Sequence, residues 1–120
     1  GHTPSLLRPA GDCAVHDLLG DNLPFGVIAD ESYVQQVAPF AAGDTLLLYS
    51  DGLSEALDSG RIEYGADRIR QLLALAGPAS PAQILERLRR APNKHTDNTK
   101  GADDRSAIVI RAQAATPGDF

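Results

Sequence analysis

The sequence predicts an α+β fold in which antiparallel strands pack against two helices. Three features lead to this prediction: an apolar run over residues 45–50, a helical spacing of apolar residues between positions 66 and 90, and a second apolar run over residues 105–111. Strands bury such runs inside a sheet, and helices with one apolar face cover the sheet. The expected order is strands, two helices and one final strand.

The first half of the chain supplies the early strands. Proline and glycine interrupt residues 3–27 so often that only short strands fit between the turns. Residues 33–37 and 45–50 are typical of a hairpin, with Gly43 and Asp44 supplying the turn between them. The second arm is apolar at consecutive positions, so we expect it at the centre of the sheet with both faces covered.

Two helices follow. Residues 66–76 have apolar side chains at helical spacing and end before a Gly-Pro pair. The second helix begins with Ser80 at the N-cap, Pro81 at the first helical position and Gln83 as the partner in a reciprocal capping box, and it ends near position 90. Its arginines are interpreted as a solvated face rather than a phosphate site; they are Arg87, Arg89 and Arg90.

The polar residues 91–102 are predicted to form a loop, in part because of Pro92, and residues 105–111 form the last strand, apolar on both faces. The chain is thus divided into a domain over residues 1–112 and a flexible tail over residues 113–120.

Composition limits the functional classes. The chain has 120 residues and a formal net charge of −5, from 11 Lys and Arg against 16 Asp and Glu, which fits one compact domain. The acidic balance argues against nucleic-acid binding, and no apolar run approaches the roughly 20 residues of a membrane span. Cys13 is the single cysteine, which excludes an internal disulfide and fits a cytoplasmic location; we expect its side chain to be buried.

Acidic residues stand at the ends of the two most apolar strands. Asp51 follows the first, and Asp103 and Asp104 precede the second. If these strands are adjacent and antiparallel, the three carboxylates converge at one edge of the sheet, where a hard divalent cation such as Mg²⁺ or Mn²⁺ would offset their repulsion. The alternative is structural: Asp51-Gly52 is also a common turn dipeptide, and Asp103 could simply begin a strand.

Five segments of the chain, in order, resemble bacterial phosphatases of the sporulation stage II protein E type. These segments are residues 1–7, 23–27, 43–56, 64–65 and 103–106. The resemblance places the chain in a branch of the PPM phosphatases, and it implies part of an α-β-β-α sandwich of antiparallel sheets. It also implies two Mn²⁺ or Mg²⁺ ions, which hold a water that attacks phosphoserine or phosphothreonine.

Carried over to this chain, the resemblance makes Asp51 and Asp103 the catalytic metal ligands. It makes Asp104 a further residue at the metal site, and it gives Gly52 a sharp turn beside the ion. The implied partner is a phosphorylated protein, such as an anti-anti-sigma factor.

The resemblance covers only the carboxy-terminal half of such a domain, which is nearly twice as long and has further acidic ligands in its amino-terminal half. The chain contains no methionine and begins with Gly1-His2, so we expect it to be excised from a longer protein. We therefore expect weak or no metal binding by the chain alone, and association through exposed sheet edges.

Two other functions stay open. One is a catalytically silent module that keeps the fold in order to bind a regulatory partner. The other is a receiver domain that is phosphorylated on Asp51. The late position of Asp103 and Asp104 disfavours the receiver, whose acidic pair comes early in the chain.

Overall fold

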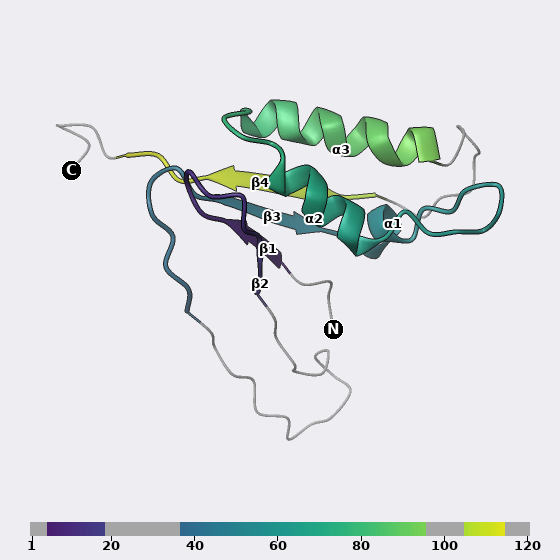
Figure 1. The fold of residues 1–120 in the computed structure, drawn as a ribbon, viewed down its shortest axis with the longest axis horizontal. Helices are drawn as coiled ribbons and strands as arrows, with labels where there is room; N and C mark the ends of the chain where they lie inside the picture. Colours follow the sequence, from purple (N-terminus) through teal and green to yellow (C-terminus); the bar gives the residue numbers. More distant parts are fainter. Residues whose placement is uncertain (1–4, 19–36, 96–104, 115–120) are drawn as a thin grey trace, which may run out of the picture.

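The computed structural model describes residues 5–18, 37–95 and 105–114, and they form one sheet with helices on one of its faces (Figure 1). The elements are β1 (Ser5–Arg8), β2 (His16–Leu18), β3 (Thr45–Tyr49), α1 (Asp51–Ser54), α2 (Ala66–Ala74), α3 (Pro81–His95) and β4 (Ala107–Arg111). The predicted α+β class is confirmed.

The four strands are arranged in the order β2-β1-β3-β4, and every pairing is antiparallel. The central position predicted for β3 is confirmed, since Leu47 pairs with Leu6 on one side and Val109 on the other. Antiparallel pairing throughout this part of the chain does not match the parallel sheet of a receiver domain.

The predicted hairpin is only partly present. The turn exists: the Asp44 N–H donates to the Ala41 carbonyl at 3.0 Å, and Gly43 has a φ of 90°. Val37, however, lies in no strand, and residues 33–36 lie outside the described part of the chain. The neighbours of β3 are β1 and β4, which are distant in sequence, so the register depends on long-range packing.

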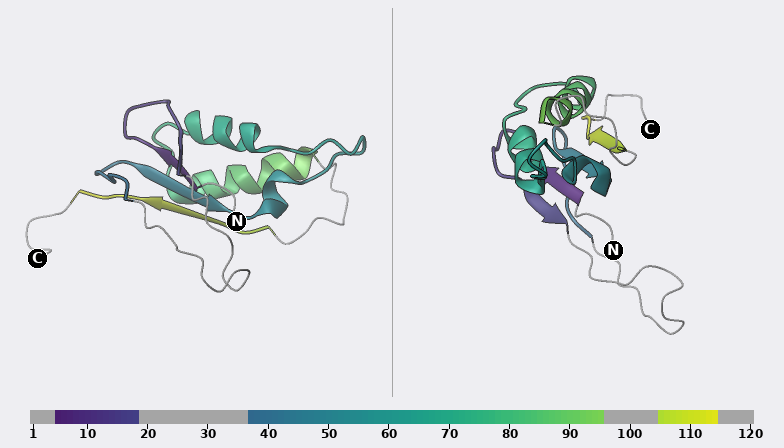
Figure 2. Two further views of the ribbon diagram at one scale, coloured as in Figure 1. Left: turned by 90° about the horizontal axis from the view of Figure 1, so that it is seen from below. Right: turned by 90° about the vertical axis from the view of Figure 1, so that its right-hand side faces the viewer.

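The helices cover one face of the sheet. Figure 2 shows α2 and α3 on the same side of the strands. The core between them consists mainly of leucine, isoleucine and tyrosine side chains that are at most 7% exposed: Leu6, Leu47, Tyr49, Leu53, Tyr64, Ile69, Leu73, Ile84 and Leu88. Arg70 ties α2 to the sheet edge, because its guanidinium lies 2.7 Å from the Asp17 carboxylate of β2.

In the part of the chain that the structure describes, the opposite face of the sheet is open over β3 and β4, so the expectation that these two strands are covered on both faces is wrong there. Leu48 is 37% exposed, and Ile108 and Ile110 are 58% and 43% exposed. These side chains alternate with the buried ones because successive residues of a strand point to opposite faces. The helices supply only one covering layer.

The capping box of α3 is confirmed. The Ser80 N–H donates to Gln83 Oε1 at 2.8 Å, and the Gln83 N–H donates to Ser80 Oγ at 3.2 Å. The helix nevertheless continues to His95, beyond the predicted end near position 90. Pro92 lies inside it with a fully buried side chain, so packing outweighs the hydrogen bond that proline cannot donate. The other predicted helix, α2, ends two residues early, at Ala74.

Cys13 is exposed, contrary to the expectation of burial, since it lies in the irregular segment between β1 and β2. In the described ranges, no helix combines the length and the apolar character of a membrane span.

Candidate metal centre

The end of β3 and the start of β4 lie side by side. Tyr49 pairs with Ala107 in the ladder. One residue further, the Ser50 N–H donates to the Ser106 carbonyl at 2.9 Å, and the Ser106 N–H donates to Ser50 Oγ at 2.9 Å. Because the strands are antiparallel, the chain after Ser50 and the chain before Ser106 leave the sheet at the same edge.

Asp51 is at this edge as the first residue of α1. Its backbone carbonyl accepts the Glu55 N–H at 2.8 Å and the Ser54 hydroxyl at 3.2 Å. The residue is exposed, and its carboxylate has no hydrogen-bond or ion-pair partner among the residues that the structure describes. An exposed carboxylate without a protein partner fits the oxygen donor that Mg²⁺ or Mn²⁺ prefers.

The other two predicted ligands, Asp103 and Asp104, lie outside the described residues, so their convergence with Asp51 stays a prediction. The described chain resumes at Arg105, directly after them. Within residues 5–18, 37–95 and 105–114, no three His, Cys, Asp or Glu side chains are grouped so that they could hold a metal ion. Metal binding by Asp51 would therefore require ligands from outside these ranges.

Tyr49 is the buried neighbour of this edge. Burial raises the pKa of its hydroxyl above the usual 10.0, the Asp17 carboxylate raises it further, Arg70 opposes the change, and Asp51 adds a smaller increase. The phenol therefore stays protonated at neutral pH and places no negative charge beside Asp51.

A hollow of about 340 Å³ opens at the same edge, on the face of the sheet that no helix covers. Its lining includes Leu48 and Ile108 from the open face and both bridging serines, Ser50 and Ser106. The hollow provides space for a ligand next to Ser50, the residue that precedes Asp51.

The structure also corrects the local interpretation of Asp51-Gly52. These residues begin a short helix instead of the turn that the dipeptide suggested, and metal binding by Asp51 stays a prediction. Gly52 is buried inside α1 and is not among the glycines with positive φ in this part of the chain, so the sharp turn expected there is absent. The hydrogen bonds between Ser50 and Ser106 were not predicted. The one signal for them in the sequence is a serine next to each of the two apolar strands.

A family model described as stage II sporulation protein E (SpoIIE) matches residues 1–113 of the chain. No curated protein sequence gives a significant match.

Solved structures of SpoIIE from Bacillus subtilis are similar to this chain over 94% of its length or more. The SpoIIE phosphatase domain, in a crystal form without domain swapping, is 26% identical to this chain, with a TM-score of 0.70. The match covers 100% of this chain and 50% of the solved one. A structure of its PP2C phosphatase domain with a fragment of the regulatory domain is 24% identical with a TM-score of 0.72, over 94% of this chain and 33% of its own. A manganese-presoaked structure of the phosphatase domain is 23% identical with a TM-score of 0.67.

The chain thus spans half or less of the length of these solved structures. The resemblance identified in the sequence is confirmed by the family match and by the fold.

Proposed function

Since the chain belongs to the stage II sporulation protein E family, we propose that it forms the carboxy-terminal part of a metal-dependent phosphatase domain that hydrolyses phosphoserine or phosphothreonine in a regulatory protein. The observation that carries this proposal is the Ser50–Ser106 bridge, with two hydrogen bonds of 2.9 Å. The bridge joins Ser50, which directly precedes Asp51, to Ser106, which lies two residues after Asp104.

Asp51, Asp103 and Asp104 would hold the metal, with Mn²⁺ or Mg²⁺ as the ions that suit carboxylate oxygens. A divalent cation there would supply the acidity that makes a water nucleophilic at neutral pH and would offset charge on the phosphoryl oxygens. In this proposal the chain presents Asp51 directly after a sheet edge whose two strands are joined by the Ser50–Ser106 hydrogen bonds, which would limit the reorganisation needed when the metal binds.

The open sheet face fits a chain that is part of a larger domain. Leu48, Ile108 and Ile110 form an apolar surface that water contacts in this chain. In the complete domain, a second sheet would cover this apolar surface. It would come from the half of the phosphatase domain that the chain does not span. That half would also contribute the additional ligands that Asp51 lacks.

The proposed substrate is a phosphorylated regulatory protein of the anti-anti-sigma type in the cytoplasm. A phosphoprotein suits the site because the hollow beside Ser50 and Ser106 is open to the outside rather than enclosed.

The test is hydrolysis of para-nitrophenyl phosphate and of a phosphoserine protein by the complete protein that contains this chain, with and without Mn²⁺. Asp51→Asn and Asp103→Asn should each reduce turnover by about 100-fold or more, since each removes a carboxylate that would hold the cation, and the cation would offset charge on the reacting phosphoryl group. Asp67→Asn, an exposed carboxylate in the first turn of α2, is the matched control and should retain activity.

The catalytically silent module is the alternative that this assay separates. A complete protein that folds but hydrolyses neither substrate with Mn²⁺ would establish the silent module and refute the phosphatase.

A further inference from the structure

We propose that a pocket between α1, α3 and β4 binds an acidic segment of the protein substrate and takes up one of its aliphatic side chains. The proposal rests on the proposed phosphatase function for the identity of the ligand as a substrate. The binding itself requires no catalysis, so the two can fail separately.

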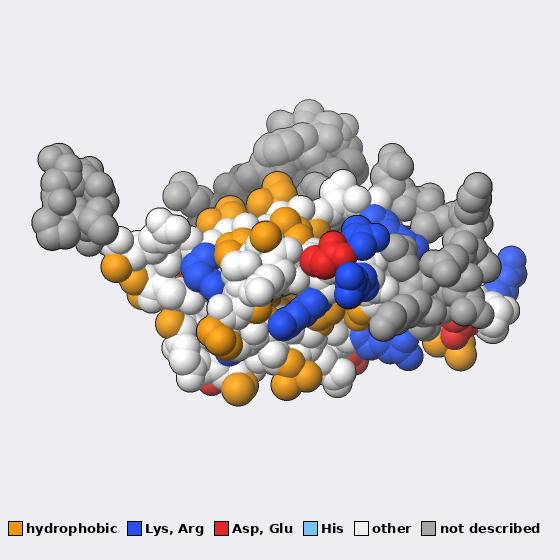
Figure 3. All heavy atoms as spheres, turned by 90° about the horizontal axis from the view of Figure 1, so that it is seen from above, with side chains coloured by type: hydrophobic (Ala, Val, Ile, Leu, Met, Phe, Trp, Pro, Cys, Tyr) orange, Lys and Arg blue, Asp and Glu red, His pale blue; other side chains and the backbone are white. Residues whose placement is uncertain are grey.

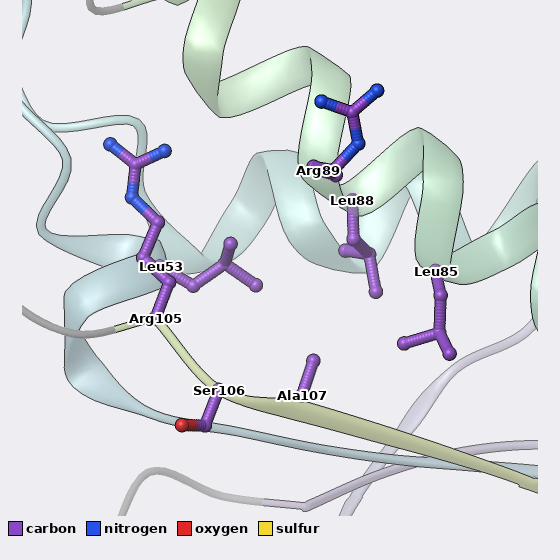
Figure 4. A pocket seen from close by; sticks show the side chains of 7 residues that line it. All are labelled: Leu53, Leu85, Leu88, Arg89, Arg105, Ser106 and Ala107. Atoms are coloured by element: carbon purple, nitrogen blue, oxygen red, sulfur yellow. The ribbon is translucent and has the colours of Figure 1, made fainter.

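The pocket has a volume of about 220 Å³ and an apolar interior. Figure 4 shows Leu53 from α1, Leu85 and Leu88 from α3 and Ala107 from β4 directed towards one another across it. Leu88 is 2% exposed and belongs to the core, whereas Leu85 is 38% exposed. An aliphatic side chain of a ligand would remove the exposed part of Leu85 from water, which favours binding.

Basic side chains line the mouth of this pocket. Arg89 and Arg105 are both among its lining residues, and in Figure 4 their guanidinium groups point away from the apolar interior. Arg89 donates to the Glu86 carboxylate through Nε at 3.0 Å and Nη2 at 2.6 Å. A guanidinium has five N–H donors, so the Nη1 end of Arg89 is available to a carboxylate of a ligand.

The charge of this face is opposite to that of the chain. The described part of α3 carries three arginines against one glutamate, whereas the whole chain has a net charge of −5. Figure 3 shows basic side chains gathered around an acidic one on the face that carries α3. A ligand segment with acidic residues beside its aliphatic side chain complements both the mouth and the interior, and such complementarity sets partner choice and speeds association.

The position of the pocket connects it with the candidate metal centre. Leu53 is two residues after Asp51 in α1, and Arg105 directly follows Asp104. The pocket and the hollow beside Ser50 share Ser106 and Ala107, and they lie at one end of the sheet. The pocket lies on the helix-covered face and the hollow on the open face, so a substrate segment held in the pocket would lie beside the edge where the metal ligands are proposed.

The test measures binding of a fluorescein-labelled, unphosphorylated peptide to the 120-residue chain by fluorescence anisotropy, without metal. The probe has one Leu with two Asp on either side, and two control peptides replace the Leu by Ser or the four Asp by Lys. The acidic Leu peptide should bind more tightly than both controls, and its affinity should fall as NaCl is raised.

Two variants test the pocket: Leu85→Ser and Arg89→Gln should each weaken binding of the acidic peptide by about fivefold. The matched control is Arg87→Gln, which lies on α3 outside the pocket and should change the affinity for the acidic peptide by less than about twofold. Circular dichroism establishes that each variant is folded. Equal affinity for the three peptides, or binding that Leu85→Ser and Arg89→Gln leave unchanged, overturns the proposal. A preference for the lysine peptide does so as well. Loss of phosphatase activity in Asp51→Asn with peptide binding intact would separate this pocket from the metal centre.

Discussion

Ser50 and Ser106 bridge the end of β3 and the start of β4 through two hydrogen bonds, one between their backbones and one from the Ser106 N–H to the Ser50 hydroxyl, both at 2.9 Å. The bridge extends the ladder by one residue past Tyr49 and Ala107. It brings two segments that are distant in sequence to one edge of the sheet, and the candidate metal centre depends on that edge.

The side-chain half of this bridge can be removed alone. Ser50→Ala leaves the Ser106 N–H without its acceptor and should lower the free energy of unfolding by about 1 kcal/mol in urea denaturation. Ser50→Thr keeps the hydroxyl and is the control. An alanine variant as stable as the original chain would show that water replaces the hydroxyl without cost.

Leu47 and Leu48 are neighbours on opposite faces of β3. Leu47 is fully buried against the helices, so Leu47→Ala should lower the free energy of unfolding by about 2–5 kcal/mol. Leu48 is 37% exposed, and Leu48→Ala should cost about 1 kcal/mol or less in this chain. Urea denaturation checks both values, and similar losses would contradict the single-sided core. In the complete domain the cost of Leu48→Ala should rise, because the proposed second sheet would bury it.

Gly43 is required by the turn before β3. Its φ is 90°, and a Cβ there would lie 2.8 Å from the Cβ of Ala10, so Gly43→Ala combines backbone strain with a steric clash. We expect a loss of about 1–3 kcal/mol or more in the free energy of unfolding. Gly11 has a φ of 69° but open space around it, so Gly11→Ala should cost less. Equal costs in thermal or urea unfolding would mean that Ala10 moves aside freely.

Glu86 is held ionised by two arginines. The hydrogen bond from Arg89 is the main cause that lowers the pKa of Glu86 from 4.5 to about 2, and Arg90 contributes through a hydrogen bond of 2.9 Å. Because the folded-state pKa is lowered, the stabilising effect is present above the ordinary pKa of the carboxyl and is lost as the pH falls towards about 2.

An NMR titration of the Glu86 carboxyl carbon should therefore have its midpoint near 2, and Arg89→Gln should raise that midpoint. Arg87→Gln, which removes a charge of α3 not paired with Glu86, should change it much less. A midpoint in the original chain close to 4.5 would show that the ion pairs do not persist in solution.

The open face and the β4 edge should promote association of the chain by itself. Ile110 lies on this edge strand and is 43% exposed, so Ile110→Lys places a charge where a second copy would pack. Sedimentation velocity should show larger species for the original chain than for this variant. Gln71→Lys, on the exposed side of α2, is the control for added charge and should leave the distribution unchanged.

Local patterns in the sequence determined the elements whose signals are local. The capping box at Ser80 and Gln83, the turn at Gly43 and the apolar run of β3 each depend on neighbouring residues, and each occurs where it was predicted. The position of Asp51 after the first apolar strand and the family resemblance also follow from the sequence, whereas the last strand begins at Ala107, two residues later than predicted.

Tertiary structure decided what depends on partners distant in the chain. The pairing of β3 with β1 and β4, the extension of α3 through a buried Pro92 and the open face of the sheet are set by which surfaces meet, and no local pattern encodes this. The sequence of an apolar strand does not show whether one or both of its faces are covered. The apolar pattern shows which side chains are suited to burial, and the covering layer comes from other parts of the protein.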